Sequence, residues 1–517
     1  MRPKIAKLIE GIAELATCNP FSPQRFALEK KLLGKESEPF DSIAWHRSAG
    51  EHGESDRPNV LKITELAAEV VDAVTKSKDL PENLTRQYWS VATYLLLYRH
   101  ITNLSYGSPL STDVKSRRQV VTSWELFWKD CLRTFDVGGN IPIDKKKAAH
   151  LFACLIQVHR AFFSIFDHIL GASEPIAKLR EQVWESVFSC NMFRYHDHLF
   201  QSMKDLSTLI TGPSGTGKEL VARAIGLSQY VPFDPDNQKF EQDGQNLFLT
   251  LNLSALSPTL IESELFGHCK GAFTGAVSAR KGWLETCSPC GSVFLDEIGE
   301  LSLELQVKLL RVLQQRTYYR LGDTAVRRFE GKIVAATNRD LELEIAQGNF
   351  REDFYFRICT DRIQTPALKD QLASRPEDLE WLVESILDKQ NLSENITSLA
   401  GDISGWISGN LGDQYSWPGN IRELEQCVGS FLIRGQYVPL QTPDRPWKEA
   451  KLPGWLKPIV DADLTADEAL CRYCTWVYFQ QGTYEKVAQI VKLDRRTVKS
   501  KIDAQLLEDL RSASQGC

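Results

Sequence analysis

The chain has 517 residues, of which 43% are hydrophobic and 25% charged, and its formal net charge is −6. This length predicts about three domains, and this composition is that of a folded protein with hydrophobic cores. The acidic balance excludes nucleic-acid binding through overall basicity, so any such binding requires a local basic patch.

The sequence carries no sign of a membrane-spanning or secretion segment. No run of about 18 uncharged apolar residues occurs. The nearest approach, residues 151–171, is interrupted by His159, Arg160 and Asp167, so we expect a buried helix there. The first residues lack the apolar core of a secretion signal. We therefore expect a cytoplasmic protein with no membrane partner.

The 12 cysteines predict reduced thiols in such a chain, not a disulfide framework. Two CxxC pairs occur, Cys287 with Cys290 and Cys471 with Cys474, and His196 lies near Cys190 in the sequence. A zinc site needs four ligands at matched spacing, and the two pairs fall in regions that we assign to different domains. Packing thiols are favoured, and a metal or redox role stays open.

The first 165 residues have a helical pattern. In segments 64–77 and 86–101 apolar residues recur at i, i+3 and i+4, which predicts helices. Proline, glycine and acidic residues between Glu36 and Pro58 indicate a loop. We expect an all-α N-terminal domain over residues 1–165.

From Ile169 onward short apolar strands alternate with helices, which predicts a parallel sheet covered on both faces. The strand at 207–211 runs into a glycine-rich phosphate loop made of Gly212, Pro213, Ser214, Gly215, Thr216, Gly217, Lys218 and Glu219. Backbone N–H groups of such a loop, with the next helix N-terminus, cradle phosphate oxygens, and the lysine adds a cation. A serine or threonine usually follows that lysine, and Glu219 departs from this pattern.

Two carboxylates end the next informative strand, residues 293–297. Asp296 can hold Mg²⁺ through water, and Glu297 can orient and deprotonate an attacking water molecule. Phosphoryl transfer mainly needs positioning and charge neutralisation, so these carboxylates beside Lys218 predict an ATP-hydrolysing site.

A glycine-bracketed hexapeptide lies between these two parts: Gly271, Ala272, Phe273, Thr274, Gly275 and Ala276. Its glycines let the backbone fold back on itself. Taken alone, it predicts a tight turn with Phe273 in a core. Its place between the two parts of an ATP site favours a mobile loop that holds Phe273 exposed to solvent.

These motifs, in this order, resemble those of the AAA+ bacterial enhancer-binding proteins, the activators of sigma-54 RNA polymerase. The resemblance covers residues 168–435 and recurs in the tail. It implies a P-loop AAA+ core at 166–368, a helical lid at 369–440, and ATP with Mg²⁺. It also explains Glu219, because this family carries glutamate there, and it places Ile169–Gly171 beside the adenine.

The resemblance also implies roles for individual residues. Residues 271–276 contact sigma-54, and Asn252 pairs with Glu297 as a switch that relays nucleotide state. Asn338 senses the γ-phosphate, Arg351 and Arg357 are arginine fingers for a neighbouring subunit, and Arg422 reaches the nucleotide from the lid. Fingers acting in trans require a homo-oligomeric ring, expected to be a hexamer. A polar stretch at 229–246 and the turn at 368–376 depart from the family.

The end of the chain predicts a DNA-binding tail. Proline-rich residues 441–460 form a linker, and residues 461–517 predict helices at 465–480, 484–491 and 495–506, the last capped by Asp494. Basic side chains after a tight turn suit a recognition helix, and the tail resembles a Fis-like helix-turn-helix. The candidate DNA contacts are Arg495, Arg496, Thr497, Lys499 and Lys501. A solvated helical hairpin is the alternative.

Three functions fit these observations. The first is a sigma-54-dependent activator that binds enhancer DNA and hydrolyses ATP to remodel the RNA polymerase holoenzyme at promoters, with the N-terminal domain regulatory by position. The second is an AAA+ ATPase that remodels another protein client and uses its tail for interactions. The third, a DNA-binding repressor with a decayed ATPase, is disfavoured because the catalytic set is complete.

Overall fold

The computed structural model describes residues 3–37, 58–101, 110, 114–137, 141–242, 244, 246–390, 395–412, 414–439 and 464–514. These residues form two compact units, 1–437 and 438–517. The expected linker at 441–460 and residues 38–57 of the expected loop lie outside the described residues.

The N-terminal region is helical, as predicted. Its helices are α1 (Pro3–Thr17), α2 (Pro23–Leu33), α3 (Pro58–Ser77), α4 (Thr85–His100), α5 (Val114–Phe135) and α6 (Lys145–His168). Helices α3 and α4 confirm the two periodic segments. Aromatic residues such as Trp124, Phe127 and Phe152 fill the core between these helices.

A five-stranded parallel sheet follows, which confirms the predicted α/β core. Its strands are β1 (Thr208–Thr211), β4 (Phe248–Asn252), β7 (Ser292–Asp296), β10 (Lys332–Thr337) and β11 (Asp361–Gln364), in the spatial order β11-β1-β10-β7-β4. Because all neighbours are parallel, the carboxyl ends of these strands meet at one edge.

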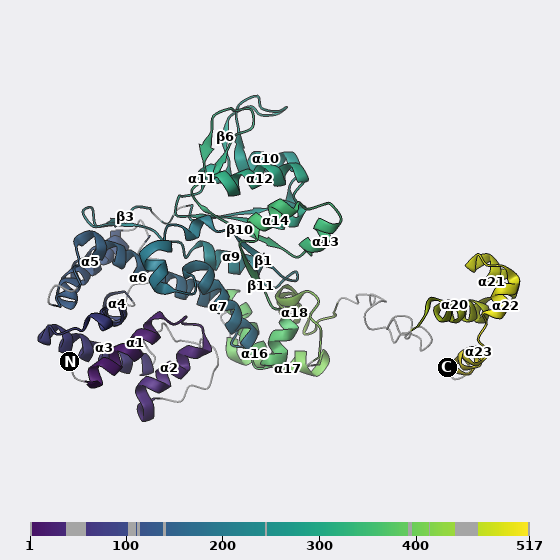
Figure 1. The fold of residues 1–517 in the computed structure, drawn as a ribbon, viewed down its shortest axis with the longest axis horizontal. Helices are drawn as coiled ribbons and strands as arrows, with labels where there is room; N and C mark the ends of the chain where they lie inside the picture. The colour runs from purple at the N-terminus through teal and green to yellow at the C-terminus, as the bar shows by residue number, and fades with distance from the viewer. Residues whose placement is uncertain are drawn as a thin grey trace. The chain divides into compact units, whose positions relative to one another are not determined.

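Helices cover both faces of the sheet (Figure 1). Successive strand residues point to opposite faces, so Ile210 and Phe294 pack with α6, α7 (Glu174–Phe188) and α9 (Lys218–Gly226). Their neighbours Leu209 and Val293 pack in the other apolar cluster. The helices in that cluster are α10 (Pro258–Phe266), α11 (Trp283–Thr286), α12 (Leu303–Gln315), α13 (Leu341–Ala346) and α14 (Glu352–Ile358).

Helix α6 joins the N-terminal helices to the core. Phe152 belongs to the N-terminal cluster, and Phe162 and Ile165 belong to the cluster on the sheet. The expected domain boundary after residue 165 therefore falls inside a continuous helix. Among the described residues α6 alone is long and apolar enough to cross a membrane, but 78% of its most apolar window is buried inside the protein. The expected buried helix is confirmed.

Short elements lie around the sheet. The hairpin β2 (Phe233–Asp234) and β3 (Lys239–Phe240) occupies the segment expected as a polar insertion. Both phenylalanines are buried, and the ring centroid of Phe233 lies 4.9 Å from that of Phe152. The other elements are α8 (Met192–Arg194), a π-helical turn at Tyr195–Leu199, the pairs β5 (Gly267–His268) with β6 (Arg280–Lys281) and β8 (Thr317–Tyr318) with β9 (Arg327–Arg328), and 3₁₀ turns at 34–36, 82–84, 203–205, 253–255 and 298–300.

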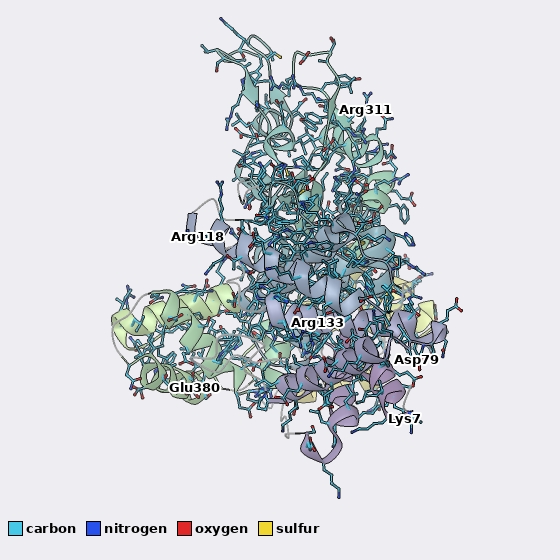
Figure 2. The ribbon with its side chains drawn as sticks, turned by 90° about the vertical axis from the view of Figure 1, so that its left-hand side faces the viewer. Lys7, Asp79, Arg118, Arg133, Arg311 and Glu380 are labelled. Atoms are coloured by element: carbon cyan, nitrogen blue, oxygen red, sulfur yellow. The ribbon has the colours of Figure 1, made fainter. Side chains whose placement is uncertain are left out.

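The lid is helical, with α15 (Leu368–Ser374), α16 (Asp378–Lys389), α17 (Ile396–Asn410) and α18 (Asn420–Arg434) around its own apolar cluster. Charged side chains lie on the outside of the first unit; Lys7, Asp79, Arg118, Arg133, Arg311 and Glu380 are all exposed (Figure 2).

The second unit holds α20 (Ala466–Gln481), α21 (Tyr484–Val491), α22 (Arg495–Ser500) and α23 (Ala504–Ser514). The first three of these helices pack around Val477, Val487 and Val498. Asp494 caps α22 as expected, accepting from the Arg496 N–H at 2.7 Å. The expected helix 495–506 is too long. It ends at Ser500 because Asp503 caps a new helix, accepting from the N–H groups of Gln505 and Leu506.

Candidate nucleotide site and hexapeptide loop

The phosphate loop connects β1 to α9 with three glycines at positive φ. Gly212, Gly215 and Gly217 have φ values of 151°, 77° and 83°. A Cβ atom at Gly212 would lie 2.1 Å from Thr365 Oγ1, and one at Gly215 would lie 2.2 Å from the carbonyl oxygen of Gly419. Only glycine fits such positions, so the loop conformation follows directly from its sequence.

Lys218 is the first residue of α9, and its side chain lies inside the loop. Its ammonium group donates to the carbonyl oxygens of Gly212 at 3.0 Å and Pro213 at 3.1 Å. Burial lowers the pKa of Lys218, while the nearby carboxylates of Glu297 and Asp296 act in the opposite direction. The cation and both predicted catalytic carboxylates therefore meet at the carboxyl edge of the sheet.

The two carboxylates differ in their surroundings. Asp296 ends β7, and burial, with the neighbouring Glu297, raises its pKa. Glu297 has a φ of 57°, which turns the chain sharply after the strand. One Glu297 carboxylate oxygen accepts the backbone N–H of Asn338 at 3.3 Å. This contact ties Glu297 to the residue after β10, where the γ-phosphate sensor was expected.

Asn252 ends β4 and lies in register with Asp296 on the neighbouring strand. Its side-chain oxygen accepts from Ser254, at 3.0 Å from the backbone N–H and 2.8 Å from the hydroxyl. The structure thus gives Asn252 a partner in its own turn. Its pairing with Glu297 as a switch stays a prediction.

The lid holds the phosphate loop through α18. The Asn420 side chain donates to the Ser214 carbonyl at 2.9 Å and accepts from the Leu368 N–H at 2.9 Å. The Ile421 N–H donates to the Gly215 carbonyl at 3.0 Å, and Arg422 reaches the Ser214 hydroxyl at 3.4 Å. Arg422 therefore lies at the loop, as the resemblance implies. Asn420 was not predicted, although it lies two residues before Arg422.

A cavity of about 80 Å³ adjoins the phosphate loop. The expected adenine segment lines it through Ile169 and Leu170, together with Gly217 of the loop and Ile421 of the lid. Its walls come from three separate parts of the chain, which suits a flat apolar base. Glu219 is exposed and ion-paired with Arg223 one turn along α9, at 3.6 Å.

The two candidate arginine fingers lie at opposite ends of α14. Arg351 precedes the helix and makes two hydrogen bonds to Asp353, at 2.9 and 2.7 Å. Arg357 is exposed near its end, while Phe354 and Ile358 are buried in the core. The helix thus presents Arg357 to the outside.

The hexapeptide connects β5 to β6, in the part of the chain that extends away from the sheet at the top of Figure 1. The Gly271 N–H donates to the Ala276 carbonyl at 2.9 Å and closes the loop. Gly271 and Gly275 have φ values of 82° and 104°, and no atom lies within 4 Å of a Cβ placed on either. Both glycines therefore serve backbone conformation and not close packing.

The expected solvent exposure of Phe273 is wrong in this structure. Its side chain is half-buried, because the ring packs edge-on against His268, with centroids 5.1 Å apart. His268 is buried and hydrogen-bonded to the Ser263 hydroxyl at 2.8 Å. Phe273 is nevertheless outside the main core, and Thr274 and Val277 beside it are exposed.

The sheet order, the phosphate loop and the two strand-end carboxylates define an AAA+ P-loop nucleotide-binding domain. Residues 190–364 match the family model of the sigma-54 interaction domain, which ends at β11 and includes the loop, both carboxylates and the hexapeptide.

Three relatives resemble this domain. The Nif-specific regulatory protein of Azotobacter vinelandii is 44% identical over 246 residues, covering 47% of this chain and 43% of the relative. That of Herbaspirillum seropedicae is 41% identical, covering 53% of this chain and 44% of the relative. The anaerobic nitric oxide reductase transcription regulator NorR of Klebsiella pneumoniae is 40% identical, covering 52% of this chain and 45% of the relative.

The resemblance to sigma-54-dependent activators is thereby confirmed over the central domain. The chain spans less than half the length of each of these three relatives.

Proposed function

We propose that this chain is an ATP-driven transcription activator that binds enhancer DNA and remodels the sigma-54 RNA polymerase holoenzyme at promoters. One observation carries the proposal. The hexapeptide Gly271–Ala276 extends from the β5–β6 pair of a domain that also holds a complete phosphate loop and two strand-end carboxylates. The names of the relatives, all regulatory proteins, support it.

ATP is the proposed substrate, and the residues fit it. The loop N–H groups and the Lys218 ammonium are donors for phosphate oxygens. Asp296 would hold Mg²⁺ through water, and the ion would supply positive charge beside the phosphates. Glu297, fixed by the Asn338 N–H, orients and deprotonates the attacking water. Arg422 contacts the nucleotide from the lid, because its guanidinium already lies at Ser214.

Hydrolysis reaches the hexapeptide through the chain itself. Asn252 ends β4 beside Asp296, and the 3₁₀ turn at 253–255 leads into α10. Helix α10 ends at Phe266, directly before β5 and the loop. A change of partner at Asn252, from Ser254 to Glu297, would therefore move the helix that carries the loop.

A ring, expected to be a hexamer, completes the catalytic site. Arg357 is exposed on α14, where the guanidinium can reach a neighbouring subunit's nucleotide. An arginine supplied in this way stabilises charge in the transition state and is worth about 10³–10⁵ in rate in related enzymes. Arg351 would first have to leave Asp353, so we assign Arg357 the larger effect.

We assign DNA binding to the tail, with α21 and α22 as a helix-turn-helix. Helix α22 exposes the side chains of Arg495, Arg496, Thr497 and Lys499, while Val498 is buried in the small core. Lys501 is ion-paired with Asp467 and only 19% exposed, so we expect it to contribute least. This function places the protein in the cytoplasm.

The test is retention of the protein on immobilised sigma-54 in the presence of ADP and a metal fluoride, a mimic of ATP during hydrolysis. We expect the wild type to be retained only with the mimic, and Thr274→Ala to be lost while its ATP hydrolysis stays within twofold. An active ATPase that never binds sigma-54 would refute the proposal and favour remodelling of another client.

A further inference from the structure

A cluster of metal-binding side chains lies away from the nucleotide site, where the N-terminal helices meet the core. His150, Cys154 and His196 place one ligand atom each within 4.8 Å of one another. It is the one group of three or more His, Cys, Asp or Glu with this spacing in the described part of the chain. The first two residues lie one turn apart on α6, and His196 lies in the π-helical turn.

The distances suit a tetrahedral ion. The Cys154 sulfur lies 3.7 and 3.8 Å from the two ring nitrogens of His150. Metal–sulfur and metal–nitrogen bonds of about 2.3 and 2.0 Å place such atoms roughly 3.6 Å apart in a tetrahedral zinc site. The sulfur and the imidazole therefore have the separation of two ligands of one ion, and a rotation of the His150 ring would direct one nitrogen toward that ion.

His196 supplies an independent argument. Its Nδ1 lies 3.0 Å from a carboxylate oxygen of Asp197, and its Nε2 is buried without a hydrogen-bond partner. A buried polar atom without a partner is costly and requires an explanation. Histidine ligands commonly donate one ring N–H to a carboxylate and bind metal with the other nitrogen. His196 has this arrangement, with Nδ1 at the carboxylate and Nε2 as the nitrogen without a partner.

His150 is oriented by its surroundings. One ring nitrogen lies 2.9 Å from the Tyr230 hydroxyl, and the other lies 3.0 Å from the His196 carbonyl. Ligation through one nitrogen replaces that hydrogen bond, and the remaining bond holds the ring in place. Both histidines thus have supporting contacts of the kind found around metal ligands.

We propose that His150, Cys154 and His196 form a binding site for a divalent transition metal ion of the Zn²⁺ type. One thiolate and two imidazoles are the ligand set that such borderline ions prefer over Mg²⁺ or Ca²⁺. Three protein ligands leave one position of a four-coordinate ion free for water or a small exchangeable ligand.

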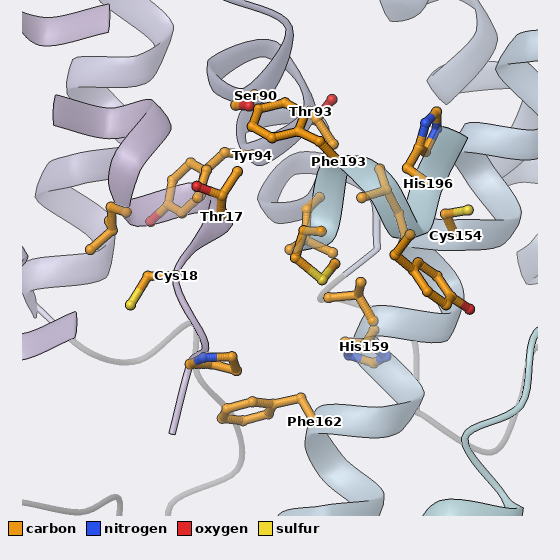
Figure 3. A pocket seen from close by; sticks show the side chains of 18 of the residues that line it. Thr17, Cys18, Ser90, Thr93, Tyr94, Cys154, His159, Phe162, Phe193 and His196 are labelled. Carbon is orange, nitrogen blue, oxygen red and sulfur yellow. The ribbon is translucent and has the colours of Figure 1, made fainter. Parts of the chain in front are cut away.

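The free position has space beside it. Cys154 and His196 also line a cavity of about 130 Å³, where Figure 3 shows them close to each other. The other walls include Thr93, Tyr94, His159 and Phe162. A water molecule needs far less room, about 10–15 Å³ by the same kind of measure. A ligand on the ion would therefore face the space between α4 and α6.

The test uses the full chain without nucleotide and Co²⁺ as a spectroscopic substitute for Zn²⁺. We expect one Co²⁺ per chain, with thiolate charge-transfer absorption in the ultraviolet and the visible bands of tetrahedral Co²⁺, both displaced by Zn²⁺. We also expect the melting temperature to rise with Zn²⁺ concentration, because the ion binds only the folded chain.

Variants separate this site from the other thiols. Cys154→Ser and His196→Gln should each lose the charge-transfer band and the rise in melting temperature. The matched controls are Cys190→Ser and His198→Gln, because both residues are exposed and lie near His196 in the sequence. Circular dichroism checks that Cys154→Ser and His196→Gln each fold, and the use of two variants keeps the test valid if one of them does not. Unchanged Co²⁺ spectra in either folded variant, or no band in the wild type, would overturn the proposal.

Discussion

Replacing Phe273 with alanine separates a loop that contacts a partner from one that packs in the core. The ring packs edge-on against the imidazole of His268, with centroids 5.1 Å apart and an interplanar angle of 67°. An aromatic pair of this kind is worth about 0.5–1.5 kcal/mol. A phenylalanine truncated in a close-packed core costs about 3–5 kcal/mol instead. We therefore expect Phe273→Ala to lower the free energy of unfolding by about 1 kcal/mol.

Two controls calibrate this prediction. Phe354→Ala removes the same kind of side chain from the core, because Phe354 is fully buried on α14. It should lower the free energy of unfolding by about 3–5 kcal/mol, as truncation in a close-packed core does. Val277→Ala alters a residue that is 80% exposed next to the loop and should leave stability unchanged. Melting temperature, ATP hydrolysis and sigma-54 retention are measured on the same preparation of each variant.

We expect Phe273→Ala to hydrolyse ATP at close to the wild-type rate while losing retention on sigma-54. A loss of stability equal to that of Phe354→Ala would refute this account, because Phe273 would then be a core residue. Full retention by the variant would refute the assignment of the ring to the contact.

Four further predictions concern other parts of the chain. Glu297→Gln should bind ATP as tightly as the wild type in a fluorescent-nucleotide titration. It should release phosphate at least about 100-fold more slowly, because a general base contributes about 10²–10⁴-fold to the rate. Arg357→Ala should also bind without hydrolysing, and mixing it with Glu297→Gln should restore activity at mixed interfaces; inactive mixtures that still form rings would exclude a trans finger. Replacing Arg495, Arg496 and Lys499 together should lower the slope of log affinity against log salt by up to about 2.7, at about 0.9 per phosphate contact, whereas Lys501→Ala, already paired with Asp467, should change it little. Burial lowers the pKa of Lys332 from 10.5 to about 8, so between these pH values the unfolded chain binds a proton that the folded chain lacks. In denaturant titrations the free energy of unfolding, relative to that of Lys332→Met, should therefore rise by about 3 kcal/mol as the pH rises through this range. A difference that does not change with pH would show that Lys332 stays charged in the folded chain.

Most of the confirmed predictions from the sequence rest on local patterns. The strands of the sheet, the phosphate loop and the capping of α22 by Asp494 depend on neighbouring residues, so their signals are continuous in the chain. The glycines of the loop could be assigned for the same reason, since positive φ is a local demand. The strands and the phosphate-loop glycines of the central domain were therefore predictable, whereas the contacts of Asn420 were not.

Features that depend on packing between distant segments were not predictable. The sequence associated His196 with Cys190, its neighbour in the chain, but Cys190 is exposed, and His196 lies instead beside Cys154 on α6. The burial of Phe233 and Phe240 against Phe152 likewise needs the fold, because a short turn-rich segment gives no helical or strand periodicity. The half-burial of Phe273 is a local contact by comparison, because His268 lies about five residues earlier at the end of β5, but it requires the loop to turn back on that strand.

Helix α9 connects the N-terminal helices to the phosphate loop. Its first residue, Lys218, lies in the phosphate loop, and its other end is held by α6. Gln157 donates to the Ser228 carbonyl at 2.9 Å, and Arg160 donates to the Leu227 carbonyl. The same helix α6 carries two residues of the proposed metal site. We therefore expect a ligand that displaces α6 to act on the C-terminal end of α9 through these two hydrogen bonds.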